Sequence, residues 1–175
     1  ELVRVLGASL ITGQHSQWLK GVKVLVIDDN RLNLDVIQRI LIQEGATPTL
    51  CQSGEEALAE LECAPHGFDL VLTDMQMPGL DGCDVSMRIR NQMNLSLPII
   101  TLTAGATTSQ QQLAEQAGID DFLTKPIEPS RLIRVIRQHV ERSQGKALPL
   151  VRKQLLIVQE DIQKIASNLE QVSIE

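Results

Sequence analysis

The stretch VLVIDDN, at residues 24–30, decides how this chain is interpreted. Four apolar residues, from Val24 to Ile27, lead directly into Asp28, Asp29 and Asn30. A continuously apolar run of this length is typical of a strand that is covered on both faces, as in a parallel sheet. The two acids therefore lie at the carboxyl end of a buried strand, which is where open α/β sheets bind their ligands.

Similar short apolar runs recur along the chain and alternate with amphipathic stretches. The runs that predict strands are KVLVI (23–27), TLC (49–51), LVLT (70–73), PIITLT (98–103) and DFLT (121–124). Helical patterns follow them at about 31–43, 53–61, 83–93 and 108–117, and from Pro129 onward. Five strand–helix units predict a flavodoxin-like, doubly wound α/β fold, with a five-stranded parallel sheet in the order 2-1-3-4-5 and helices on both faces.

Local signals mark several helix ends. Ser53, with Glu56 three residues later, has the pattern of a capping box. Gly45 and Gly118 are plausible stops for the helices that precede them. Pro78, Gly79 and Gly82 indicate a turn after the third strand.

Composition excludes several classes of function. The chain has 175 residues and a formal net charge of −6, which disfavours sequence-independent binding of nucleic acid. No apolar run approaches the roughly 20 residues of a membrane span, and no signal-like segment follows Glu1, so we expect a piece of a longer protein without membrane contact of its own. Scattered cysteines, at 51, 63 and 83, indicate reduced thiols and a cytoplasmic location.

Three carboxylates are expected to meet at one edge of the predicted sheet. Asp28 and Asp29 follow the first strand, and Asp74 follows the third. These strands are neighbours in the predicted order, roughly 4.8 Å apart. Three like charges in one place are costly unless a cation lies between them. Oxygen ligands of this kind suit Mg²⁺.

Two further residues complete this edge. Thr103 ends the fourth predicted strand, and Lys125 follows the fifth. Carboxylates, a divalent ion, a hydroxyl and an ammonium group around one cavity suit a tetrahedral, dianionic phosphoryl group. The arrangement predicts in-line attack by one carboxylate on a phosphoryl donor, which would give an aspartyl phosphate.

These motifs together resemble the response-regulator receiver domains of two-component signalling, over about residues 22–143. The resemblance rests on VIDDN (26–30), TDMQMPGLDG (73–82), LTA (102–104) and DDFLTKPI (120–127). Each motif alone is weak, whereas their order at the ends of four strands is specific. The motifs MPGLDG (77–82) and TKPI (124–127) are most similar to those of receivers attached to hybrid sensor histidine kinases.

The resemblance implies a role for each site residue. Asp74 would be the phosphoacceptor, and Asp29, Asp74 and the backbone carbonyl of Gln76 would ligate Mg²⁺ (or Mn²⁺), with Asp28 acting through water. Lys125 would bind a phosphoryl oxygen. Thr103 would move toward the phosphoryl group, and Phe122 would swing inward behind it as a two-state switch. The family often has tyrosine where Phe122 stands, so a signal that needs that hydroxyl is in doubt.

The implied function is that of a switch within a phosphorelay. The phosphoryl group would come from a phosphohistidine of a histidine kinase or phosphotransfer domain. The fragment itself would be a phosphoacceptor rather than a turnover enzyme, although a hybrid sensor histidine kinase is expected as its parent protein. One alternative is a degenerate receiver that only binds proteins. An aspartyl phosphatase of the haloacid dehalogenase kind is another, but Gln76 stands where that family has an acid.

Segments at both ends fall outside the receiver-like block. Residues 1–21 are interpreted as a short helix and linker, and residues 144–175 as an amphipathic C-terminal helix. Its apolar residues follow a heptad spacing: Val151, Leu155, Val158, Ile162, Ile165, Leu169 and Val172. Residues 151–172 are interpreted first as a helical linker or a homodimeric coiled coil. The alternatives are the first helix of a four-helix phosphotransfer domain and a helix packed on its own receiver.

Overall fold

Five parallel strands alternate with helices in this chain. A computed structural model describes residues 17–105 and 107–145. The sheet has the order β2-β1-β3-β4-β5, so the predicted flavodoxin-like, doubly wound α/β fold is confirmed. The strands are β1 (Lys23–Ile27), β2 (Thr47–Cys51), β3 (Leu70–Asp74), β4 (Ile99–Thr103) and β5 (Asp121–Thr124). The helices are α2 (Arg31–Gln43), α3 (Gly54–Cys63), α4 (Gly82–Asn91), α5 (Thr108–Gln116) and α6 (Pro129–Gln144).

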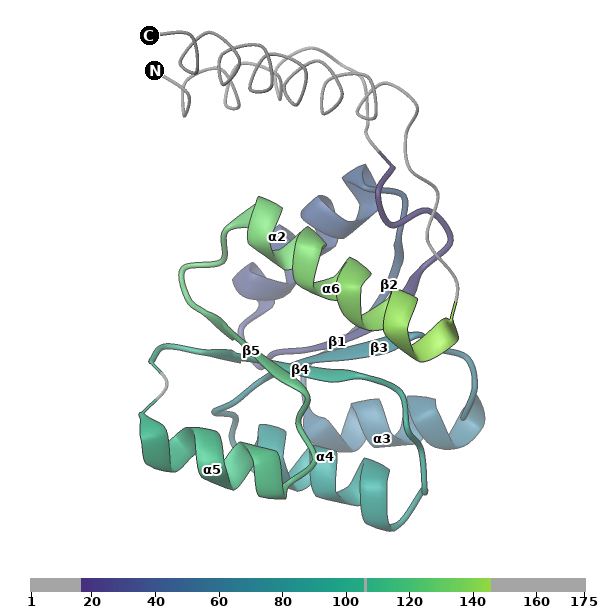
Figure 1. Cartoon of the computed structure of the whole chain (residues 1–175). Helices are drawn as coiled ribbons and strands as arrows, with labels where there is room; N and C mark the ends of the chain where they lie inside the picture. Colours follow the sequence, from purple (N-terminus) through teal and green to yellow (C-terminus); the bar gives the residue numbers. More distant parts are fainter. Residues whose placement is uncertain (1–16, 106, 146–175) are drawn as a thin grey trace, which may run out of the picture.

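Two apolar layers hold the helices against the sheet. Helices α2 and α6 cover one face, and α3, α4 and α5 cover the other (Figure 1). Side chains alternate along β1, so that Val24 and Val26 pack in the α2–α6 layer whereas Leu25 and Ile27 pack in the opposite layer. Strands β3 and β4 are buried at every position, as their continuously apolar sequences predicted.

The register of the sheet brings the carboxyl ends of four strands to one edge. Ile27 pairs with Thr73, so Asp28 follows β1 beside the end of β3. Asp74 pairs with Leu102, one residue before Thr103. Thr103 in turn pairs with Thr124, the residue that precedes Lys125. Strand pairing therefore brings Asp28, Asp74, Thr103 and Lys125 to this edge.

Several element boundaries differ by one or two residues from those predicted, and β2 and α4 have identifiable causes. Strand β2 begins at Thr47 rather than residue 49 and includes Pro48. A proline is tolerated there because β2 is an edge strand, where a missing backbone donor costs little. Helix α4 begins at Gly82 and ends at Asn91 rather than spanning 83–93. A capping box between Asp81 and Asp84 fixes its start, and the sequence interpretation did not use that signal.

Helices α2 and α3 begin at side-chain caps. The Asn30 side chain accepts a hydrogen bond from the Leu32 N–H at 3.0 Å and starts α2 directly after the acidic pair. Ser53 caps α3 by accepting from the Glu56 N–H, as predicted. The Glu56 carboxylate, however, accepts from the N–H of Gln52 rather than from that of Ser53, so the second half of the predicted capping box is wrong.

Residues 17–22, which we call the N-terminal strap, pack against the sheet domain. The Leu19 N–H donates to the carbonyl of Glu44, and the Leu19 side chain is fully buried. The Trp18 ring lies beneath the guanidinium of Arg137 in α6, 5.0 Å from its carbon. The sequence placed residues 17–21 in a linker. The strap instead packs against the C-terminal end of α2 and the middle of α6. The division of the chain at residues 22 and 143 stays a prediction.

The remaining sequence predictions concern the chain ends and the thiols. The heptad segment at residues 151–172 lies outside the described residues. Within the described part of the chain, no helix combines the length and the apolar character needed to cross a bilayer. Cys51, Cys63 and Cys83 are all free thiols.

Candidate functional site

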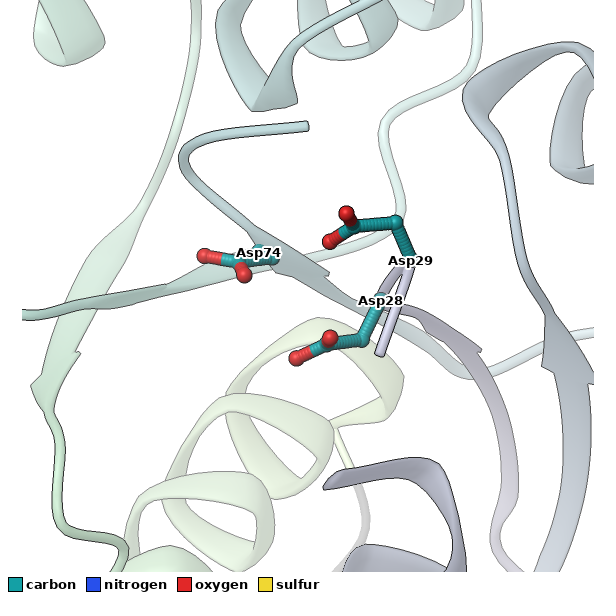
Figure 2. A group of neighbouring side chains, drawn as sticks. All are labelled: Asp28, Asp29 and Asp74. Atoms are coloured by element: carbon teal, nitrogen blue, oxygen red, sulfur yellow. The ribbon is translucent and has the colours of Figure 1, made fainter. Parts of the chain in front are cut away.

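Three carboxylates lie together at the carboxyl edge of the sheet. Asp28 and Asp29 directly follow β1, and Asp74 is the last residue of β3 (Figure 2). One carboxylate oxygen from each residue lies within 4.8 Å of the other two. Asp28 is fully buried and Asp74 nearly so, whereas Asp29 is exposed. The cluster that the sequence predicted is therefore present, and it opens to solvent on the side of Asp29.

Lys125 joins two of these acids. Its Nζ donates to Oδ2 of Asp74 at 2.7 Å and to Oδ2 of Asp28 at 3.2 Å. Burial alone would lower the pKa of Lys125, but the hydrogen bonds and charges of Asp74 and Asp28 outweigh it, so the pKa is raised. The lysine is thus held as an ammonium ion beside the candidate nucleophile.

Asp28 is restrained by donors from the start of α2. Its Oδ1 accepts from the Asn30 N–H at 2.9 Å, and the Asn33 side-chain amide donates to both carboxylate oxygens, at 3.1 and 3.0 Å. Sequence reasoning missed Asn33. The available signal was its place on the first turn of a helix that begins directly after the acids, which turns this side chain back toward the strand end.

Gly82 is a second residue whose role was not recognised from the sequence. It is the first residue of α4 and packs against the end of β3. A Cβ built on Gly82 would lie 2.5 Å from the carbonyl oxygen of Asp74 and 3.2 Å from the Cα of Met75. Only glycine permits this approach, so Gly82 fixes the backbone that carries Asp74.

Thr103 lies at the same edge, and its hydroxyl bonds within its own loop. Oγ1 donates to the carbonyl of Gly105 at 2.9 Å and accepts from the Gly105 N–H at 3.3 Å. The Thr103 side chain is almost completely buried. Phe122, in β5, is half-buried and packs in the apolar layer beneath α3, α4 and α5. The switch roles of both residues stay predictions.

Gln76 is exposed and contacts the candidate nucleophile through its backbone. Its N–H donates to Oδ1 of Asp74 at 3.4 Å. The two oxygens of Asp74 therefore have different partners, the Gln76 amide for one and the Lys125 ammonium for the other. The predicted role of the Gln76 carbonyl as a metal ligand remains a prediction.

The donor set fits a hard divalent cation. Three carboxylates face one ammonium group, so negative charge is in excess at an edge that solvent reaches. Carboxylate oxygens are the ligands that Mg²⁺ prefers, and this ion uses one or two of them together with waters. Asp29 and Asp74 are placed to supply such ligands, and Asp28 lies close behind them.

The family model described as the response regulator receiver domain matches residues 24–137. The chain belongs to this family. The receiver match begins after the N-terminal strap and ends at Arg137, the residue that contacts Trp18. The resemblance inferred from the motifs at the strand ends is therefore confirmed.

Several known proteins are similar to this receiver. Sensor histidine kinase GacS of Pseudomonas protegens is 40% identical over 118 residues, which cover 65% of this chain and 13% of that protein. Hybrid signal transduction histidine kinase L of Dictyostelium discoideum is 35% identical over 122 residues, which cover 67% of this chain and 7% of that protein. The chain thus spans only a small part of these relatives, and they are receiver-containing histidine kinases of the kind the sequence predicted.

A solved complex contains a similar receiver. It is the co-crystal structure of the Saccharomyces cerevisiae histidine phosphotransfer signaling protein Ypd1 with the receiver domain of its downstream response regulator Ssk1. The match has a TM-score of 0.62 at 26% identity and covers 67% of this chain and 88% of that chain.

Proposed function

We propose that this receiver accepts a phosphoryl group from a phosphohistidine onto Asp74, in the presence of Mg²⁺ or Mn²⁺. The observation that carries the proposal is the bond of 2.7 Å between the Lys125 ammonium and a carboxylate oxygen of Asp74, within a cluster of three acids. A paired lysine and an acidic cation site are what a carboxylate nucleophile needs to meet a dianionic group.

The chemistry follows from the partners of Asp74. A carboxylate oxygen of Asp74 would attack phosphorus as the bond from phosphorus to the donor's imidazole nitrogen breaks, and the leaving imidazole would keep the electron pair. Lys125 would exchange its bond to Asp74 for one to a phosphoryl oxygen, since its ammonium group is already at hydrogen-bond distance. The divalent ion, when bound by Asp29 and Asp74, would neutralise further phosphoryl charge.

The switch would follow from a change of partner at Thr103. Its hydroxyl now bonds to the Gly105 carbonyl and would turn to a phosphoryl oxygen on Asp74. Phe122 would then move into the space that Thr103 leaves. Because Phe122 lacks a hydroxyl, its output would depend on ring position alone.

The wider context is also a proposal. We infer a phosphorelay within a hybrid sensor histidine kinase, because the similar regions of GacS and of kinase L belong to much longer kinases. A histidine kinase or a phosphotransfer protein would be the donor, as the pairing of Ypd1 with the Ssk1 receiver illustrates. A cytoplasmic location accords with three free thiols.

The alternative of a degenerate interaction module is less well supported. Such a module would have no need for a lysine held between two acids, or for three carboxylates within 4.8 Å of one another. Clustered like charges cost stability and are retained where they bind a cation or react.

The test is intact mass after incubation with acetyl phosphate, comparing wild type with Asp74→Ala. We expect wild type to gain one phosphoryl group, roughly 80 Da, only when Mg²⁺ is present. The variant should gain none. The same gain in Asp74→Ala, or no gain in wild type, would contradict the proposal and favour the degenerate module.

A further inference from the structure

The carboxylate of Asp28 has more partners than a single ion pair requires. This group is fully buried, and it accepts from the Asn30 N–H, from the Asn33 amide on both oxygens, and from Lys125. A carboxylate has about four lone-pair positions, so these four bonds leave little freedom to rotate.

Asp28 shares its charged partner, Lys125, with Asp74, whereas its neutral donors, Asn30 and Asn33, bond to Asp28. Lys125 lies nearer to Asp74, at 2.7 Å, than to Asp28, at 3.2 Å. If Lys125 turns toward a group on Asp74, Asp28 keeps only the donors from the start of α2. A buried carboxylate without donors is costly, so these neutral bonds hold it through that change.

We propose that Asn33 is a positioning residue that fixes the Asp28 carboxylate so that the acid cluster can bind its divalent cation. Asn33 does not touch the cation in this account, and it acts through Asp28. The inference deepens the proposed function, because it rests on the same cation site. It adds a residue from α2 to a site otherwise built at the strand ends.

Local structure explains why Asn33 is suited to this task. The Asn30 cap starts α2, and Leu34, beside Asn33, is buried and holds that turn against the sheet. The Asn33 amide therefore reaches Asp28 from a fixed helical turn. As a neutral donor, it also orients the acid without adding positive charge that would repel a cation.

The test measures binding of Mg²⁺ alone by titration calorimetry, without any phosphodonor. Asn33→Leu has nearly the same size but no donor, and we expect its Kd for Mg²⁺ to rise about 10-fold, at the lower end of the range for loss of an outer-shell partner of a metal site. Gln43→Leu is the matched control, because Gln43 lies exposed at the far end of the same helix. Its Kd should equal that of wild type.

Acetyl phosphate labelling at saturating Mg²⁺ separates positioning from loss of structure. We expect the labelling defect of Asn33→Leu to shrink as Mg²⁺ rises to saturation, because enough cation compensates for weaker binding. An unchanged Kd in Asn33→Leu, or a lower Tm with an unchanged Kd, would overturn the inference and leave Asn33 a purely structural residue. Asn33→Ala gives a second variant if Asn33→Leu does not fold.

The outcomes also distinguish this inference from the proposed function. If wild type neither binds Mg²⁺ nor gains a phosphoryl group, the proposed function fails and the inference fails with it. If wild type does both and the Asn33 variants match its Kd, only the inference is wrong.

Discussion

Lys125 is the one cation that the described residues place among the three carboxylates, and its loss should destabilise the metal-free protein. Lys125→Met keeps most of the side-chain length but removes two hydrogen bonds to Asp28 and Asp74. We expect the free energy of unfolding in urea to fall by about 2 kcal/mol, the magnitude for hydrogen bonds to charged groups. Mg²⁺ should restore part of the lost free energy of unfolding, because the ion neutralises the same acids. Equal stability of the two proteins without Mg²⁺ would contradict this reading of Lys125.

The raised pKa of Lys125 gives this difference a pH dependence. A group whose pKa is higher in the folded state contributes stability that is complete below its unfolded pKa, about 10.4. The contribution is lost as the pH rises through the folded pKa, which the partners of Lys125 raise above 10.5. The stability difference between wild type and Lys125→Met should therefore be constant near neutral pH and shrink as the pH rises through the alkaline range. A difference that shrinks already as the pH rises through neutrality would indicate another group.

Gly82 sets the position of Asp74 through the backbone. In Gly82→Ala the new Cβ would lie 2.5 Å from the Asp74 carbonyl oxygen, so α4 or the end of β3 must shift. We expect a loss of about 1–3 kcal/mol in the free energy of unfolding, as for other overpacked sites, together with slower labelling by acetyl phosphate. Gly105→Ala is the matched control for stability, because its Cβ would meet nothing within 4 Å. Equal stability of the two variants would show that α4 can shift without a cost in stability, and would contradict this prediction.

Among the elements, the N-terminal strap adds to the receiver fold. It precedes the region that the family model matches, yet Leu19 is fully buried and Trp18 contacts α6. Leu19→Ala should lower the free energy of unfolding by about 2–4 kcal/mol, because it leaves a cavity in the α2–α6 layer. Leu113→Ala in α5 removes a leucine that is 62% exposed and should change little. If both variants unfold at the same urea concentration, the strap does not contribute to the core.

Sequence patterns predicted those elements and site residues whose causes are local. Continuous apolar runs identified buried strands, and the rule that ligands bind at the carboxyl ends of strands placed Asp28, Asp74 and Lys125 together. Other features depend on contacts between distant segments. Trp18 meets Arg137 only after α6 has folded back across the sheet, and Gly82 meets Asp74 only through the α4 turn. Neither contact has a periodic signature, so a pass along one sequence does not find them.

At the scale of the whole molecule, the sheet brings negative charges together at one edge. Apolar contacts buried elsewhere in the fold offset the repulsion between these charges. Two apolar layers hold β1 and β3 side by side, and this pairing forces the acids together whether or not a cation is present. The fold therefore carries an electrostatic cost that a bound divalent ion removes. Any ligand that binds only the folded state adds stability by mass action, and the whole domain should respond because its unfolding is cooperative.

Mg²⁺ should therefore raise the Tm of the entire receiver, and Asp29 offers the cleanest control. At a free Mg²⁺ concentration 100 times its Kd, the expected gain in the free energy of unfolding is about 2.7 kcal/mol. Asp29→Asn removes an exposed carboxylate without disturbing either apolar layer. Its Tm without Mg²⁺ should equal or exceed that of wild type, because repulsion among the acids falls, while the gain from Mg²⁺ should shrink. Thermal unfolding followed by circular dichroism measures both quantities, and an equal Mg²⁺ response in the two proteins would place the cation away from the three acids.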